Sequence, residues 1–327
     1  MAPAARSPDG TLTAVFNRIL SGLGRTLIAA GVILLLFVGY QLWGTSLEQA
    51  GHQKDLTQQL ESQVAPEGSS LDDVTASLAE VDPATAPPTE PAAEGEPLGV
   101  IEIPRIAVQQ VFIEGVSKAD LKKGPGHYPS TPLPGQAGNA ALAGHRTTYG
   151  APFNRIDELQ PGDPINVYTP QGKFRYEVVA PPPGVGIEQG PGWYSVAPEQ
   201  TEVLGPTDDN RLTLTACHPK RSAKQRIVVQ AILANEPAPT SPAPEPQPGT
   251  ETAAGPSSDA DLFGGDPSAK WPALAFGLGF LAVWLLAWFV GHKWWKKPWL
   301  AYVVLSPVMA VLLWFCFYHA DHWLPSF

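Results

Sequence analysis

Leu212-Thr213-Leu214-Thr215-Ala216-Cys217-His218-Pro219 is the most informative stretch of this 327-residue chain. Its apolar and β-branched residues predict a buried strand, and its cysteine lies where that strand enters a polar turn rich in lysine and arginine. A thiol becomes a good nucleophile where nearby cations or an imidazole favour the thiolate. Cys217 is therefore a candidate nucleophile at the end of a strand.

Two other strand ends carry the remaining groups that acyl transfer needs. His145 ends a short apolar run, and Arg226 begins the apolar run that follows the basic turn. A hairpin between that run and the cysteine strand would bring Arg226 close to Cys217. Taken singly, His145 fits a structural role equally well, and Arg226 fits a surface ion pair. Together, thiol, imidazole and cation form the set for acyl transfer.

Two further histidines compete with His145 for the acid–base role. His218 adjoins Cys217, so on a strand it would face the opposite side. His127 lies in a loop of glycine and proline, where we expect local hydrogen bonds. Both are weaker candidates than His145.

Residues 98–234 have the pattern of a small β domain. Apolar runs there are short and separated by turns rich in proline and glycine, which predicts a mainly β fold, either a barrel or a sandwich. The expected strands are Leu98–Ile103, Val108–Gly115, Ala140–His145, Pro164–Tyr168, Lys173–Val179, Arg211–Cys217 and Arg226–Leu233, with helical turns at Ser117–Lys122 and Phe153–Leu159.

Three apolar stretches are long enough to cross a bilayer, which takes about 20 residues. They are 26–43, 271–290 and 300–318. The first lacks a cleavage pattern and predicts an uncleaved anchor, while a helical hairpin buried in a soluble protein is the alternative for the other two. Cationic residues mark 1–25 and the loop 291–299 as cytoplasmic, so the β domain and the tail 319–327 would lie outside the cell.

Two stretches rich in proline, alanine and glutamate flank the β domain. Residues 44–97 contain helical patterns at 44–64 and 71–81, which would form a stalk, a lid, a dimer contact or a transient solvated helix before an extended linker. Residues 235–270 predict a disordered linker. The net charge of −10 is carried largely by the linkers and argues against a nucleic-acid partner.

Cysteine usage indicates a free thiol. The chain has 2 cysteines, and Cys316 falls inside the third apolar stretch, so the two are not expected to pair. A lone thiol in an extracytoplasmic domain is more often reactive than structural. The sequence shows neither a metal-ligand cluster nor a phosphate-binding glycine loop, so we expect no metal and no cofactor.

These motifs resemble those of sortases, the membrane-anchored cysteine transpeptidases of Gram-positive cell surfaces. The resemblance is carried by Gly124–Tyr128, by Ala143–Gly150 (Ala-Gly-His-Arg-Thr-Thr-Tyr-Gly) and by the cysteine stretch followed by Arg226, and it covers most of 98–234. The residues around His145 and Cys217 are most like the class E type of actinobacteria. The resemblance implies an eight-stranded barrel in which His145, Cys217 and Arg226 are catalytic.

The resemblance also implies a reaction and its partners. Cys217 would cleave a C-terminal sorting signal, Leu-Ala-x-Thr-Gly or Leu-Pro-x-Thr-Gly, between Thr and Gly through a thioester. His145 would serve as acid and base, and Arg226 would stabilise the oxyanion or hold the peptide. Surface proteins bearing the signal, an amine of a peptidoglycan precursor and the lipid bilayer are the expected partners. Tyr149, Thr147 and Thr215 are candidate substrate contacts.

Departures from the family pattern leave alternatives open. Sortases usually have threonine directly before the cysteine, where this chain has Ala216. Paired C-terminal apolar stretches suggest a pilin-polymerising sortase, which would use a protein lysine as its amine. Asp82-Pro83-Ala84 lies where those enzymes carry a lid but lacks the lid's aromatic residue. The non-enzymatic alternative is a membrane-tethered barrel that binds peptides.

Overall fold

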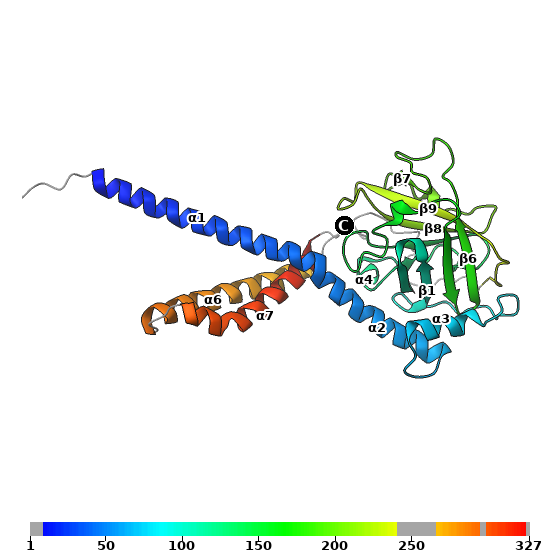
Figure 1. Cartoon of the computed structure of the whole chain (residues 1–327), viewed down its shortest axis with the longest axis horizontal. Coiled ribbons are helices and arrows are strands. Elements are labelled where there is room, and N and C mark those ends of the chain that lie inside the picture. The colour runs from blue at the N-terminus through cyan, green and yellow to red at the C-terminus, as the bar shows by residue number, and fades with distance from the viewer. Residues whose placement is uncertain (1–8, 241–265, 295–298, 325–327) are drawn as a thin grey trace, which may run out of the picture. The chain divides into compact units, whose positions relative to one another are not determined.

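The computed structural model describes residues 9–240, 266–294 and 299–324 (Figure 1). It divides into two compact units, Met1–Gly44 and Thr45–Phe327. The first unit contains helix α1, Asp9–Gly39, followed by a π-helical turn, Tyr40–Gly44. Most of the predicted linker 235–270 falls outside the described residues, as do residues 295–298 of the predicted loop 291–299 and both ends of the chain.

Eight strands of the second unit form a closed barrel, which confirms the expected fold. They are ordered β6-β5-β1-β2-β3-β4-β8-β9, and pairing of β6 with β9 closes the barrel, while β7 pairs with β9 alone. The strands are β1 Pro97–Ile103, β2 Val108–Glu114, β3 Gly126–His127, β4 Asn139–Ala143, β5 Pro164–Thr169, β6 Gly172–Val178, β7 Tyr194–Val196, β8 Arg211–His218 and β9 Gln225–Leu233.

Side chains that alternate along the strands fill the barrel. In β6, Phe174, Tyr176 and Val178 are buried in the core and the residues between them are exposed. β8 is buried along nearly its whole length, because its two faces are both covered. Leu212, Leu214 and Ala216 belong to the interior core, which places Thr213, Thr215 and Cys217 on the opposite face.

Two helices that precede the barrel pack on its wall. α2, Thr45–Val64, is tied to β2 by the Gln53 side chain, which donates to the Val111 carbonyl and accepts from the Val111 amide, both at 2.9 Å. α3, Leu71–Ala79, begins at a capping box of Ser70 and Asp73. The apolar cluster between helices and strands contains Leu56, Leu60, Val74, Leu78, Val100, Val111, Ile113 and Tyr168. The transient solvated helix considered from the sequence is therefore wrong.

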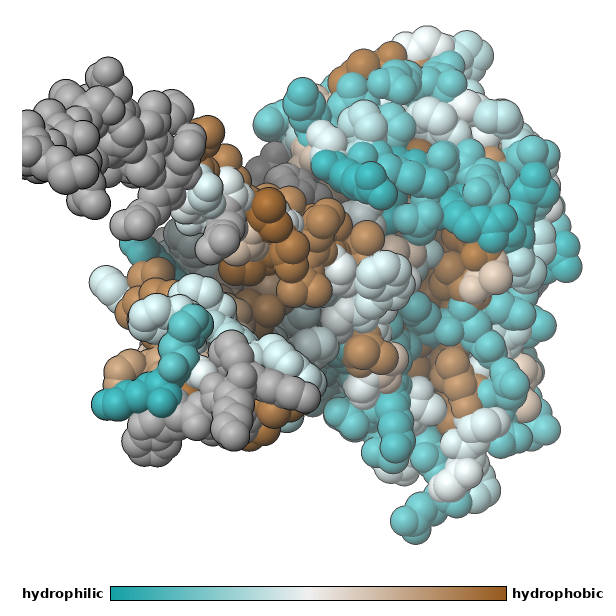
Figure 2. All heavy atoms as spheres, turned by 60° about the vertical axis from the view of Figure 1, so that its left-hand side comes forward, coloured by the Kyte–Doolittle hydropathy of each residue, from teal (hydrophilic) through white to brown (hydrophobic). Residues whose placement is uncertain are grey.

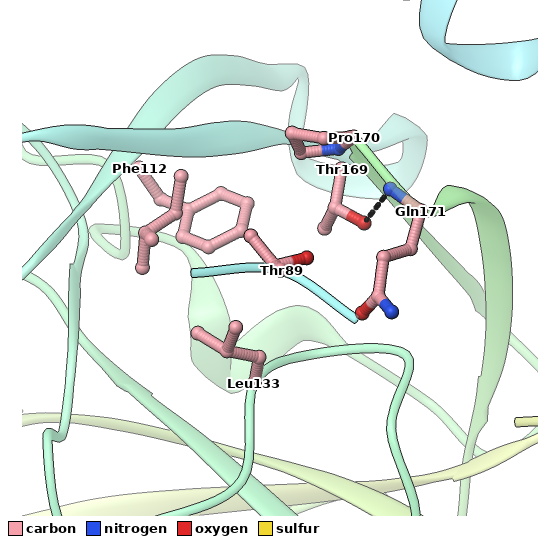
Figure 3. Close-up of a pocket in the computed structure, with 7 residues that line it drawn as sticks. Thr89, Phe112, Leu133, Thr169, Pro170 and Gln171 are labelled. Carbon is pink, nitrogen blue, oxygen red and sulfur yellow. Dashed lines mark hydrogen bonds between the residues drawn. The ribbon is translucent and has the colours of Figure 1, made fainter. Parts of the chain in front are cut away.

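The extended linker after α3 lies at the barrel end formed by the β5–β6 turn. Gln171 in that turn donates to the carbonyl oxygens of Pro87 and Pro239. A small pocket there is lined mainly by apolar groups, together with Thr89, Thr169 and Gln171 (Figure 3). The antiparallel registers of β6, β9 and β8 place this turn at the opposite end of the barrel from Cys217. Pro83 packs against Gly172, so residues 82–84 do not cover the cysteine.

Two long helices complete the second unit. They are α6, Lys270–Trp294, and α7, Trp299–Trp323, which lie side by side in Figure 1 with Phe276 stacked on Phe315 at a centroid distance of 5.2 Å. Among the described residues, three helical segments are long and apolar enough to cross a membrane: Leu20–Val64, Pro267–Lys293 and Trp299–Trp323. The barrel itself presents a mainly hydrophilic face in Figure 2.

Candidate active site

Strand register brings the three predicted catalytic residues to one end of the barrel. Cys217 in β8 lies directly opposite Arg226 in β9. β4 runs parallel to β8, with Ala143 opposite Thr215, and the Gly144 amide donates to the Thr215 carbonyl at 3.1 Å. His145 therefore leaves β4 at the level of Cys217. Cys217 and Arg226 on paired strands, and His145 just beyond the end of β4, thus lie at one end of the barrel.

Burial controls the protonation of His145. Its side chain is 3% exposed, and its Nε2 atom is buried without a hydrogen-bond partner. Burial, followed by the positive charge of Lys122, lowers the pKa of His145 to about 4. The imidazole is therefore neutral near pH 7 and ready to accept a proton. Cys217 is also buried, at 4% exposed.

Arg226 lies folded onto the turn between β8 and β9. Its Nη1 atom donates to the carbonyl oxygens of Ala223 and Gln225, at 2.9 and 3.1 Å. These bonds fix the guanidinium beside the strand position opposite Cys217. The backbone register therefore places Arg226 on the strand next to Cys217, at the same level.

Comparison with known proteins identifies the family of this site. Residues 101–234 match the model of the sortase domain. Sortase D of Bacillus subtilis is 31% identical over 47% of this chain and 72% of its own length. This chain belongs to the sortase family. Sortase SrtE1 of Streptomyces coelicolor is 32% identical over 71% of this sortase, which spans 60% of the length of SrtE1. The solved sortase E of Streptomyces avermitilis is 35% identical, covers 44% of this sortase and 91% of that chain, and gives a TM-score of 0.37.

Ala216, which replaces the usual threonine of the family, does not face the thiol of this sortase. Its side chain lies in the interior core with Leu214, while Thr215 and Cys217 occupy the other face of β8. Thr215 is buried, with its Oγ1 atom 3.0 Å from the Tyr128 hydroxyl. The departure at residue 216 therefore changes packing inside the barrel and leaves the face of the nucleophile unaltered.

Arg146 is a buried residue in contact with the Cys217 backbone that sequence reasoning missed. It is 2% exposed, and its Nη1 atom donates to the Cys217 carbonyl at 3.3 Å and lies 2.7 Å from Nδ1 of His218. Its Nη2 atom pairs with Asp157 at 3.0 Å. Partial burial raises the pKa of Asp157, but the Arg146 guanidinium, hydrogen bonds and the charge of Lys220 together lower it below its usual value. Arg146 thus positions the backbone that carries the nucleophile.

The other two histidines of the domain make structural contacts. His127 is buried, with Nδ1 2.9 Å from Glu114 and Nε2 3.0 Å from the Pro132 carbonyl, which confirms the expected local hydrogen bonding. His218 contacts Arg146, and its Nε2 atom lies 3.3 Å from Glu188. Neither competes with His145, whose Nε2 atom lacks such a partner.

The candidate substrate contacts differ in their accessibility. Tyr149 is 1% exposed, and its ring centroid lies 5.3 Å from that of His145. Thr215 is also buried, whereas Thr147 is partly exposed. Because Tyr149 is buried, a peptide can contact its ring only after the side chains that cover Tyr149 have moved. Among the described residues, no group of three or more histidine, cysteine or acidic side chains gathers as a metal site requires.

Proposed function

We propose that this sortase is a membrane-anchored cysteine transpeptidase. It cleaves a C-terminal sorting signal of the Leu-Ala-x-Thr-Gly or Leu-Pro-x-Thr-Gly kind between Thr and Gly, and transfers the protein to an amine of a cell-wall precursor. The observation that carries the proposal is the register that sets Cys217 opposite Arg226, with His145 at the same level, two residues beyond the end of β4.

The first half of the reaction forms a thioester. Nε2 of neutral His145 takes the proton of the Cys217 thiol as the sulfur attacks the Thr carbonyl carbon. The guanidinium of Arg226 stabilises the oxyanion. The C–N bond to Gly then breaks as the imidazolium gives its proton to the leaving amine. Because burial disfavours the charged imidazole, that proton is transferred readily.

The second half resolves the thioester. An incoming amine loses its proton to His145 and attacks the acyl carbon, so that a C–N bond forms and the C–S bond breaks. The departing sulfur regains a proton from the imidazolium. This sequence consumes no oxidant, reductant or cofactor, and it restores the thiol and the neutral imidazole.

Contacts of the barrel support an extracytoplasmic catalytic domain in a protein with several membrane spans. The Tyr149 amide donates to Oγ1 of Thr45 at the start of α2, and the Tyr149 hydroxyl donates to Asp321 at the end of α7. These helix ends therefore belong on the same side of the membrane as the barrel. Together with the cationic cytoplasmic flanks, this arrangement supports cytoplasmic placement of residues 1–25 and 291–299.

The paired helices α6 and α7 favour one second candidate, a polymerase that joins pilin subunits through a lysine of the acceptor protein. The two candidates share the thioester and differ in the amine that resolves it. Supplying a cell-wall precursor amine and a lysine-bearing protein in competition separates them.

A transpeptidation assay tests the proposal. Full-length protein in detergent is incubated with each sorting peptide, with and without a small amine, and the products are separated by mass. We expect an amine-linked product that depends on Cys217. Peptide binding that persists in Cys217→Ala, with no product from either peptide in the wild type, would instead establish the non-enzymatic barrel.

A further inference from the structure

The loop that follows His145 has a strained backbone. Tyr149, Gly150 and Ala151 are three consecutive residues in the left-handed region, with φ of 51°, 71° and 42°. Two of them are not glycine, and such residues persist where surrounding contacts hold them in place. Contacts from two distant helices hold this loop.

One contact comes from α2. Oγ1 of Thr45 accepts from the Tyr149 amide at 3.2 Å. The Gln49 side chain packs so closely against Gly150 that a Cβ atom there would lie 2.5 Å from its Oε1 atom. Helix α2, which precedes the barrel, therefore fixes the backbone of the loop.

The other contacts come from the end of α7. The Tyr149 hydroxyl donates to Oδ2 of Asp321 in a short hydrogen bond. Lys118 donates to the carbonyl oxygens of Leu324 and His322, at 2.7 and 3.3 Å. These bonds link residues far apart in the sequence and dock the end of the C-terminal hairpin on the barrel.

The docked contact is buried and charged. Asp321 is 6% exposed and Lys122 is 5% exposed, with the Lys122 ammonium 5.0 Å from the centroid of the Tyr149 ring. Buried charges are costly unless other groups stabilise them, and here the Tyr149 hydroxyl donates to Asp321 while Lys122 lies over the Tyr149 ring. Such an arrangement defines one docked geometry.

The docked geometry closes the active site. The Tyr149 ring lies against His145, and both side chains are almost fully buried. A sorting peptide must reach the imidazole and the thiol beside it, so Tyr149 must move before catalysis. Its movement requires loss of the hydrogen bond to Asp321.

We propose that the hydrogen bond from Tyr149 to Asp321 is a clasp by which the C-terminal helical hairpin controls opening of the active site. Asp321 is then a positioning residue, because its hydrogen bond holds Tyr149 against His145. When α7 shifts in the membrane or the clasp breaks, the strained loop relaxes and the imidazole and thiol become accessible. The clasp is distinct from a lid at residues 82–84, which lie at the other end of the barrel.

Alkylation of Cys217 tests the clasp without any sorting peptide. Full-length protein carrying Cys316→Ala is treated with iodoacetamide in detergent, and modification of Cys217 is followed by mass spectrometry. We expect Tyr149→Phe to raise the alkylation rate about tenfold, because it removes the hydroxyl bound to a carboxylate. Asp321→Asn should raise it several-fold. The double variant should match Tyr149→Phe, because both changes break one interaction.

Asp266→Asn is the matched control. Asp266 lies at the same end of the hairpin, and its carboxylate accepts from the Ser268 amide without contact to the loop. Alkylation in this variant should equal that of the parent. Equal rates in all variants, effects that multiply in the double variant, or an equal rise in Asp266→Asn would overturn the clasp.

Two further readouts separate opening from general loosening of the fold. In the peptide assay, Asp321→Asn should lower KM with kcat unchanged, whereas a merely structural role would lower kcat. Amide hydrogen exchange should quicken in segment 145–153 and stay unchanged in β6. Faster exchange in both segments would contradict the proposal. Because alkylation needs no transpeptidation, its outcome stands apart from success or failure of the proposed function.

Discussion

Buried polar groups form hydrogen bonds at one end of the barrel, whereas several at the other end lack hydrogen-bond partners. At the β5–β6 turn, Gln171 accepts from Gln136 and donates to Pro87 and Pro239, so its side chain is fully used. At the Cys217 end, buried polar atoms are left without hydrogen-bond partners. Among the described residues these atoms are His145 Nε2, Arg146 Nε and Gln225 Oε1, and all of them lie at that end, beside the ion pair of Asp157 with Arg146.

This contrast separates stability from function within one small fold. Unpartnered buried polar atoms cost free energy, and native proteins keep few of them. Their concentration around Cys217 indicates that this end is built to receive a ligand and protons, while the opposite end holds the linkers in place. Substitutions at the two ends should therefore affect different measurements.

Removal of the nucleophile should give the largest effect on activity. Cys217→Ala should abolish transpeptidation, a loss of about 10⁴-fold or more, because no thioester forms. The melting temperature should change little, since the strand register is unaffected. Product formation measured by mass spectrometry checks the expectation. Amine-linked product above background would show that the Cys217 end is not where the thioester forms.

Arg226 should rank next. Arg226→Ala should lower kcat/KM about 100-fold, because it removes the cation opposite Cys217. Lys224→Ala, two residues away in the basic turn, should keep kcat/KM within about twofold of wild type, because solvent and salt screen an exposed charge. Steady-state kinetics of the two variants compares them directly. Equal losses would mean that the turn acts only as a diffuse positive field.

Arg146 and Gln171 give a matched test of the two ends. Arg146→Met should lower kcat about tenfold or more, because the Cys217 carbonyl loses its donor and Asp157 loses its partner. Gln171→Ala should lower the free energy of unfolding by about 2 kcal/mol, because it strands buried carbonyl groups, and should leave kcat unchanged.

Denaturant titration and steady-state kinetics on both variants provide the measurements. Loss of kcat in Gln171→Ala, or an unchanged kcat in Arg146→Met, would show that the two ends are not separate.

The last prediction concerns the dependence of stability on pH. The pKa of His145 is about 4 in the native protein, below the ordinary value of 6.5. As the pH falls from 6.5 toward 4, the unfolded chain binds a proton that the native protein does not, so the free energy of unfolding decreases. The total loss is on the order of 3 kcal/mol and is complete below the native pKa. Above pH 6.5 this penalty is absent.

His145→Asn provides the control for that prediction, because asparagine does not titrate. Denaturant unfolding of both proteins between pH 4 and 7 should give curves that converge at acid pH as the wild type loses stability. Parallel curves across this range would mean that His145 is accessible to protons in the native state.

Much of this arrangement could be predicted from local patterns. Alternating apolar residues located the long strands, and the basic turn between β8 and β9 implied the hairpin that pairs Cys217 with Arg226. β3 and β7 were not predicted from the sequence, because they have 2 and 3 residues, too few to show alternation.

The remaining features depend on contacts between distant segments. Helical patterns in 44–64 and 71–81 were visible, but nothing in them specified β1 and β2 as their partner. Arg146 gave no sign of burial, since arginine is normally exposed. The bond between Tyr149 and Asp321 joins residues 172 positions apart, and no local pattern encodes such a pair.

Trapping of the acyl enzyme tests the central claim most directly. Full-length protein is incubated with a Leu-Ala-x-Thr-Gly or Leu-Pro-x-Thr-Gly peptide without added amine, quenched in acid and digested for mass spectrometry. We predict that the peptide containing Cys217 carries the acyl group ending in Thr, and that a small amine releases it. Absence of an adduct with both peptides, or an adduct on another residue, would contradict the assignment of this end of the barrel as the active site.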